Sequence, residues 1–257
     1  NKMRVTIIQS GLEWENPNAN KINFEKKIKE VAHNSDLILL PEMFTTGFSM
    51  NPQGFADLYP GETSAWMSKM ATENSIALTG SYIAKENSNY FNRMIFAYPN
   101  GDIVYYDKRH LFRMAGEDKN YSAGNKRVVV NYMGWRILLL VCYDLRFPVW
   151  SRNRNDYDLI LLVANFPERR RYAWNSLLVA RAIENQCYVA ACNRVGDDGN
   201  GVKHFGDSQI IDPLGQPIAI ANPNRDEIIT ATLSLDNLKK IRESFPVHLD
   251  ADRFEIL

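Results

Sequence analysis

The feature that most constrains this chain is a run of five apolar residues over 137–141 that ends abruptly at a cysteine. A run this short and unbroken is typical of a strand buried on both faces of a sheet. The chain turns polar directly afterwards, at Asp144 and Arg146, and Pro148 then favours a turn or a short helix. A thiol at such a strand end is rigidly held, and the following backbone N–H can face a substrate oxygen. Cys142 is therefore a candidate nucleophile, with a buried core residue as the alternative.

Composition and charge exclude several classes of protein. The chain has 257 residues, with 30 basic and 30 acidic side chains and 45% hydrophobic residues. This length and apolar content fit an α/β fold with a large core. A net charge of zero argues against an extended nucleic-acid surface, and no apolar run reaches the length that spans a bilayer. We therefore expect a protein that binds neither nucleic acid nor membrane.

Cysteine and histidine show no pattern typical of a metal site. The three cysteines are an odd number and we find no secretory signal, which together predict reduced thiols in a cytoplasmic protein. Cys187 and Cys192 fall in an apolar run, where we expect core residues. The four histidines are scattered along the chain. We therefore predict no zinc site.

Strand-like and helical segments alternate along the whole chain, and no linker divides it. This pattern predicts one α/β domain over residues 1–257. The helix expected over 172–185 would turn Leu177, Leu178 and Ile183 inward. The other expected helices cover 18–34, 61–74 and 235–244, and the expected strands cover 3–9, 36–40, 75–84, 90–98, 103–106, 128–132, 137–141, 157–163, 188–193, 208–212, 217–221 and 227–233.

Three of the expected strands end in side chains that could take part in catalysis. Glu42 follows the strand over 36–40, Lys108 follows the strand over 103–106, and Cys142 follows the central strand. If the three strands share one sheet edge, a carboxylate, an ammonium and a thiol meet. Glu42 could then accept the thiol proton, and Lys108 could stabilise a thiolate and an oxyanion. A capping glutamate and a surface lysine are the alternatives for the two charged residues.

The sequence blocks around these residues carry a family resemblance. They read PEMF over 41–44, DKRHLF over 107–112 and VCYDLRFP over 141–148. In this order and at this spacing they resemble the three signature blocks of the nitrilase superfamily, the carbon–nitrogen hydrolases. Further segments, among them 147–153 and 180–186, look like the bacterial omega-amidase branch of that superfamily.

The resemblance implies an α/β fold, a four-layer α-β-β-α sandwich that usually forms a homodimer. It implies that Glu42 is the general base, Lys108 the cation beside the oxyanion and Cys142 the nucleophile. Family members carry a second glutamate soon after the lysine. Glu117 lies where that motif belongs, and we expect it to orient Lys108 or the substrate amide. An exposed loop acid is its alternative.

The omega-amidase resemblance also implies a substrate, a small dicarboxylic monoamide such as 2-oxoglutaramate or 2-oxosuccinamate. Its amide would be hydrolysed through a thioester on Cys142, with the backbone N–H of Tyr143 helping to hold the oxyanion. These steps need no metal or organic cofactor, so we expect none. The free carboxylate of such a substrate calls for a guanidinium. Arg113 and Arg146 are the candidates, although Arg146 could instead form an ion pair with Asp144.

Aromatic and basic residues elsewhere could complete the pocket. Phe44, Phe166 and Trp174 could form its wall, although aromatic residues at such positions are often core. The three consecutive arginines over 169–171 are expected to form a solvated loop.

Three rival interpretations remain open. His110 could act as the base in place of Glu42. The same fold could carry another specificity, as a nitrilase, another amidase, a carbamoyl-amine hydrolase or an acyl transferase. A non-catalytic interaction protein could also have kept the fold. Variants of Glu42 and His110 test the first interpretation, and release of ammonia from a panel of amides and nitriles tests the other two.

Overall fold

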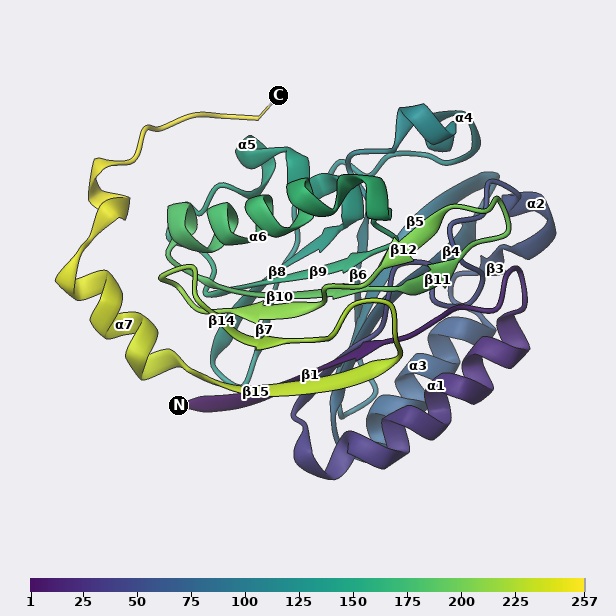
Figure 1. Cartoon of the computed structure of the whole chain (residues 1–257), viewed down its shortest axis with the longest axis horizontal. Coiled ribbons are helices and arrows are strands. Elements are labelled where there is room, and N and C mark those ends of the chain that lie inside the picture. The colour runs from purple at the N-terminus through teal and green to yellow at the C-terminus, as the bar shows by residue number, and fades with distance from the viewer. Residues whose placement is uncertain (257) are drawn as a thin grey trace.

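Two β-sheets lie face to face at the centre of the computed structural model, which describes residues 1–256, and helices cover their outer faces (Figure 1). The strand order of the first sheet is β15 (Glu227–Ser234), β1 (Lys2–Gln9), β2 (Leu37–Leu39), β4 (Ala77–Glu86), β5 (Asn89–Ala97) and β6 (Ile103–Asp107), with β3 (Asp57–Leu58) paired to β4. The order of the second sheet is β14 (Pro217–Ile220), β13 (Gln209–Ile211), β10 (Tyr188–Asn193), β9 (Leu159–Ala164), β8 (Trp135–Val141) and β7 (Val129–Tyr132). A separate hairpin pairs β11 (Val195–Asp197) with β12 (Lys203–Phe205).

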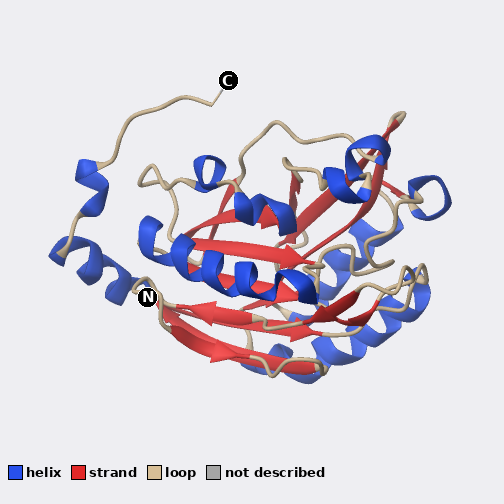
Figure 2. Ribbon diagram, turned by 45° about the horizontal axis from the view of Figure 1, so that its top comes forward, coloured by secondary structure: helices blue, strands red, loops and turns tan. Residues whose placement is uncertain are grey.

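The helices form the two outer layers, so the expected four-layer sandwich is confirmed (Figure 2). The first sheet is covered by α1 (Pro17–Val31) and α3 (Glu62–Asn74), and the second by α6 (Arg171–Asn185). The remaining helices are α2 (Pro52–Phe55), α4 (Glu117–Asn120), α5 (Pro148–Ser151) and α7 (Leu235–Ser244). No helix within residues 1–256 is long and apolar enough to cross a membrane.

The strands are apolar on both faces because each sheet lies between two other layers. In β2, Leu37 and Leu39 belong to the core between the sheets, whereas Ile38 packs in the core under α1 and α3. This is why such strands appear in the sequence as unbroken apolar runs. Cys187 and Cys192 are fully buried core residues, as expected, with Cys187 against α6 and Cys192 against β1 of the facing sheet.

The residues that form the buried face of α6 differ in part from the expectation. Trp174, Leu178 and Ala182, at four-residue steps, form its buried stripe, and Leu177 is only partly buried. The prediction that Ile183 points inward is wrong, because this residue lies next to the stripe and is 51% exposed.

The strand ends that carry the candidate residues belong to both sheets. Strands β2 and β6 run in the same direction and end at one edge of the first sheet. Strands β8 and β9 are parallel and end together in the second sheet. The condition that the strands before Glu42, Lys108 and Cys142 share one sheet edge is therefore not met. The three side chains meet across the interface between the two sheets.

Candidate active site

Four buried side chains from strand ends of both sheets meet between the sheets. Glu42 follows β2 and Lys108 follows β6, while Cys142 and Asn165 follow β8 and β9. Cys142 has a φ of 47°, in the left-handed region that residues other than glycine rarely adopt. The carboxylate of Asp144 stabilises this turn by accepting the Val141 N–H at 2.9 Å. A sharp turn directly after a rigid strand thus holds the thiol in place.

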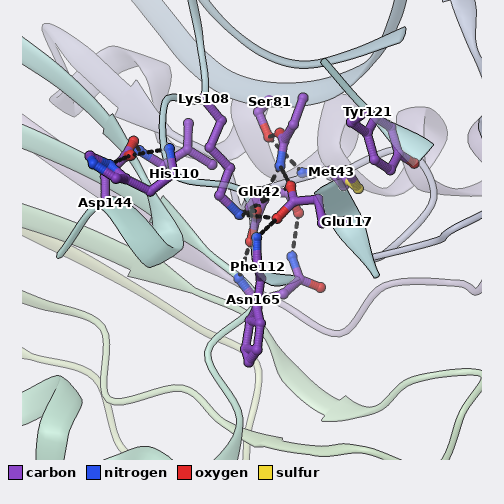
Figure 3. A network of polar contacts seen from close by, with 12 residues as sticks. Glu42, Met43, Ser81, Lys108, His110, Phe112, Glu117, Tyr121, Asp144 and Asn165 are labelled. Carbon is purple, nitrogen blue, oxygen red and sulfur yellow. Dashed lines mark hydrogen bonds and ion pairs between the residues drawn. The ribbon is translucent and has the colours of Figure 1, made fainter. Parts of the chain in front are cut away.

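Lys108 is the centre of a buried ionic network (Figure 3). Its Nζ lies 3.0 Å from Glu42 Oε1 and 2.9 Å from Glu117 Oε2. Burial alone would lower the pKa of Lys108, but the charges of Glu117 and Glu42 outweigh it and the pKa is raised. The raised pKa favours the cationic form of Lys108. Burial, and the neighbouring charge of Glu42, raise the pKa of Glu117 against the opposing effect of Lys108.

The Cys142 thiol lies between a carboxylate and an ammonium. Burial, followed by the charge of Glu42, raises the pKa of the thiol well above its usual value, and Lys108 opposes the shift. The resting thiol is consequently protonated at neutral pH. A nucleophilic attack from this position requires a base that removes the proton as the new bond forms.

Two asparagines that the sequence analysis did not single out hold Glu42 in position. Asn92 Nδ2 donates to Glu42 Oε1 at 2.7 Å, and the backbone N–H of Asn165 donates to Glu42 Oε2 at 2.8 Å. Asn165 directly follows a buried strand, so the rule that selected Cys142 could also have found it. Asn92 lies within β5 and carries no comparable sequence signal.

The side chain of His110 contacts Asp144 and Phe147. Its Nδ1 lies 2.7 Å from Asp144 Oδ1, and its ring stacks on Phe147 with centroids 3.9 Å apart. In Figure 3 the pair of His110 and Asp144 lies apart from the cluster around Glu42. The other oxygen of Asp144 accepts from the Tyr106 hydroxyl. Among the described residues Asp144 forms no ion pair with Arg146, so that alternative is not supported.

Two adjoining pockets open beside Cys142. The inner pocket, of about 30 Å³, is lined by Cys142, Tyr143, Arg146 and Phe166, and the outer pocket has a volume of about 160 Å³. Both volumes lie below the range of roughly 300–1,000 Å³ that is typical of pockets for drug-sized ligands. The site therefore fits a small molecule. The residues shared by the two pockets are Phe48, Phe112, Asn165, Pro167 and Arg170.

Three residues expected at the pocket lie elsewhere. Phe44 is fully buried in the core under α1 and α3, against Phe24. Trp174 packs behind Phe166, with centroids 5.2 Å apart, and is absent from the lining of both pockets. Arg113 has a side chain that is 84% exposed and forms an ion pair with Asp118 at 3.0 Å.

The run of three arginines over 169–171 is not the uniformly solvated loop that we expected. Arg171 forms an ion pair with Asp207 at 2.7 Å. Arg170 is partly buried and lines both pockets, with its guanidinium 5.1 Å from the centre of the Phe112 ring. The run was misleading because three adjacent cations usually avoid burial, whereas here the turn into α6 points them in different directions.

Replacing Lys108 by methionine is expected to destabilise the protein by about 3 kcal/mol, because two buried carboxylates lose their cation. The free energy of unfolding in urea at pH 7 measures this effect. The double variant Lys108→Met/Glu117→Gln should recover part of the loss, since it removes one unpaired carboxylate. An unchanged stability of Lys108→Met would show that the network contributes nothing to folding.

Comparison with known proteins adds independent findings. The model of the carbon-nitrogen hydrolase family matches residues 4–243. The chain is 48% identical over 254 residues to omega-amidase YafV of Escherichia coli (strain K12), covering 99% of this chain and 98% of that relative. It is 34% identical over 255 residues to 2-oxoglutaramate amidase of Bacillus subtilis (strain 168), covering 97% of each. XC1258 of Xanthomonas campestris, a CN-hydrolase superfamily protein whose crystal structure has an arsenic adduct in the active site, is 43% identical, with a TM-score of 0.98 and full coverage of both chains.

Proposed function

Since the chain belongs to the carbon–nitrogen hydrolase family, we propose that it is an omega-amidase acting on small dicarboxylic monoamides such as 2-oxoglutaramate and 2-oxosuccinamate. The products are the dicarboxylic acid and ammonia. The observation that carries this proposal is the buried contact of Lys108 with both Glu42 and Glu117, beside the Cys142 thiol. The omega-amidase and the 2-oxoglutaramate amidase among the relatives support the choice of substrate class.

The proposed mechanism follows from the charges around the thiol. Glu42 accepts the proton of Cys142 as the sulfur attacks the amide carbon. Lys108 and the backbone N–H of Tyr143 stabilise the oxyanion of the tetrahedral intermediate. Glu42 then returns the proton to the departing ammonia, which leaves a thioester on Cys142. A water molecule that gives its proton to Glu42 hydrolyses the thioester and restores the thiol.

The small, partly aromatic pockets and the arginines beside them support this specificity over the rivals. Nitrile and simple amide substrates carry no charge that would need a guanidinium, whereas a dicarboxylic monoamide carries a carboxylate at its far end. A non-catalytic role is disfavoured because burying two carboxylates and an ammonium together is costly unless they have a function.

The decisive experiment measures ammonia release from 2-oxoglutaramate, 2-oxosuccinamate, glutamine and a simple aliphatic nitrile. We expect selective turnover of the two oxo-amides. Preferred turnover of the nitrile, or activity confined to carbamoyl amines in a parallel assay, would replace the omega-amidase proposal with another specificity of the family. Absence of turnover with every compound would favour the non-catalytic interpretation.

The homodimer implied by the family resemblance stays a prediction. Exposed apolar side chains on the outer layer support it, because such residues often mark an interface. They are Val149 on α5, and Tyr172 and Ile183 on α6, which are 58%, 88% and 51% exposed.

A further inference from the structure

The guanidinium of Arg170 lies at the junction of the two pockets, and no carboxylate of residues 1–256 lies within ion-pair distance of it. It lies over the Phe112 ring, and its Nη2 donates to the Sδ of Met114 at 3.0 Å. Its Nη1 is buried and has no hydrogen-bond partner among residues 1–256. A thioether is a weak acceptor, and Met114 is 75% exposed. Much of the hydrogen-bonding capacity of Arg170 is therefore available to a ligand.

A second guanidinium shares this environment. Arg146 lines the inner pocket together with Arg170 and Cys142. Within the described part of the chain, neither arginine has a carboxylate partner at ion-pair distance, in contrast to Arg113 and Arg171. Burial, followed by the charges of Arg169 and Arg146, lowers the pKa of Arg170. A bound anion would relieve both the mutual repulsion and the loss of hydration.

The position of Arg170 is tied to the catalytic network through Phe112. Glu117 Oε2 accepts the backbone N–H of Phe112 at 2.5 Å and also contacts Lys108 Nζ. The ring on which Arg170 stacks is thereby held by the same carboxylate that holds the lysine. These contacts would fix the distance between a carboxylate bound at Arg170 and the amide carbon at Cys142. A fixed distance favours substrates of limited length.

We infer that Arg170, with Arg146 beside it, binds the free carboxylate of the substrate and so selects acidic amides over neutral ones. The inference rests on the proposed function, whose substrates carry that carboxylate. Arg113, the other candidate from sequence, is excluded because it lines neither pocket and forms an ion pair with Asp118. Arg170 is thus a specificity-determining residue that acts on substrate binding rather than on the chemical step.

The first test compares 2-oxoglutaramate with 4-oxopentanamide, an amide of the same chain length that keeps the oxo group and carries a methyl group in place of the carboxylate. Arg170→Met should lower kcat/KM for 2-oxoglutaramate by about 10- to 100-fold, mainly through KM, as expected for the loss of charge-assisted hydrogen bonds. The loss for 4-oxopentanamide should be much smaller, so the preference for the acidic amide collapses. Arg113→Met is the matched control and should leave the preference intact. Equal losses on both substrates for Arg170→Met would overturn the inference.

A second test measures binding without turnover and separates this inference from the proposed function. We expect 2-oxoglutarate, the acidic product, to bind the wild-type protein and to bind Arg170→Met at least about tenfold more weakly, by titration calorimetry. If the wild-type protein binds this acid through Arg170 but does not hydrolyse 2-oxoglutaramate, the proposed function fails and the carboxylate site stands. Equal affinity of both proteins for 2-oxoglutarate, or absence of binding to the wild type, would overturn the carboxylate site.

Discussion

Replacing Cys142 by alanine is expected to lower kcat for 2-oxoglutaramate by about 10⁵-fold or more, as removal of a catalytic nucleophile does in other hydrolases. The thiol forms the covalent bond to the substrate in the proposed mechanism, and alanine offers no atom that can replace the sulfur. The fold should persist, because alanine meets the same left-handed backbone at this position as cysteine does. Ammonia release and the free energy of unfolding, measured on the same preparation, check both statements.

Cys192→Ala is the matched control for this prediction. Cys192 is fully buried in the core between the sheets, where its Sγ faces the backbone oxygen of Ile8 at 3.4 Å. Its replacement should cost about 1 kcal/mol of stability through the cavity that it leaves, with kcat unchanged. Substantial ammonia release by the folded Cys142→Ala variant would rule out the thioester mechanism.

Glu42→Gln is expected to lower kcat by about 10³- to 10⁴-fold, because one group serves as base for the thiol, proton donor to ammonia and base for water. The change is nearly isosteric, but the amide has a single acceptor oxygen. Glu42 accepts from Asn92, Lys108 and the Asn165 N–H. The new NH₂ group would therefore face a donor, and we expect an additional loss of about 1–3 kcal/mol in stability.

His110→Ala separates this assignment from its rival. Because Asp144 holds the imidazole of His110 and Phe147 stacks on it, we expect this variant to lose activity only modestly, through the support that the pair gives to the turn at Cys142. Both variants are assayed for kcat across the same pH range. An inactive His110→Ala together with an active Glu42→Gln would transfer the role of general base to the histidine.

The strand ends show how far local sequence can predict this site. Glu42, Lys108 and Cys142 each follow an apolar run, and the structure brings them together as the family resemblance implies. Their catalytic roles stay predictions until the variants are measured. Asn92 escaped notice because an asparagine inside a strand is distinguished only by the carboxylates that it contacts across the fold.

The arginines show where local sequence misleads. Arg113 adjoins a family block and looked like a carboxylate ligand, yet its side chain points to solvent and pairs with Asp118. Arg170 belongs to a run of like charges that is typical of a solvated loop, yet its guanidinium lies on Phe112 beside the pocket. The position of Arg113 follows from a local ion pair within its own loop. The position of Arg170 depends instead on how the turn before α6 packs against Phe112 from a distant loop.

The sequence by itself determined which segments become buried strands and the strand ends from which the candidate catalytic residues project, whereas the four layers were implied by the family resemblance. The periodicity of the apolar residues and the sharp change from apolar to polar residues are local properties of the sequence. They decide which segments become buried strands. The tertiary structure alone decided that Cys142 faces Glu42 and Lys108 from the opposite sheet, and that Arg170 rather than Arg113 reaches the pocket. The physical reason is that these contacts join residues far apart in the chain, and their geometry follows from the packing of whole layers and loops.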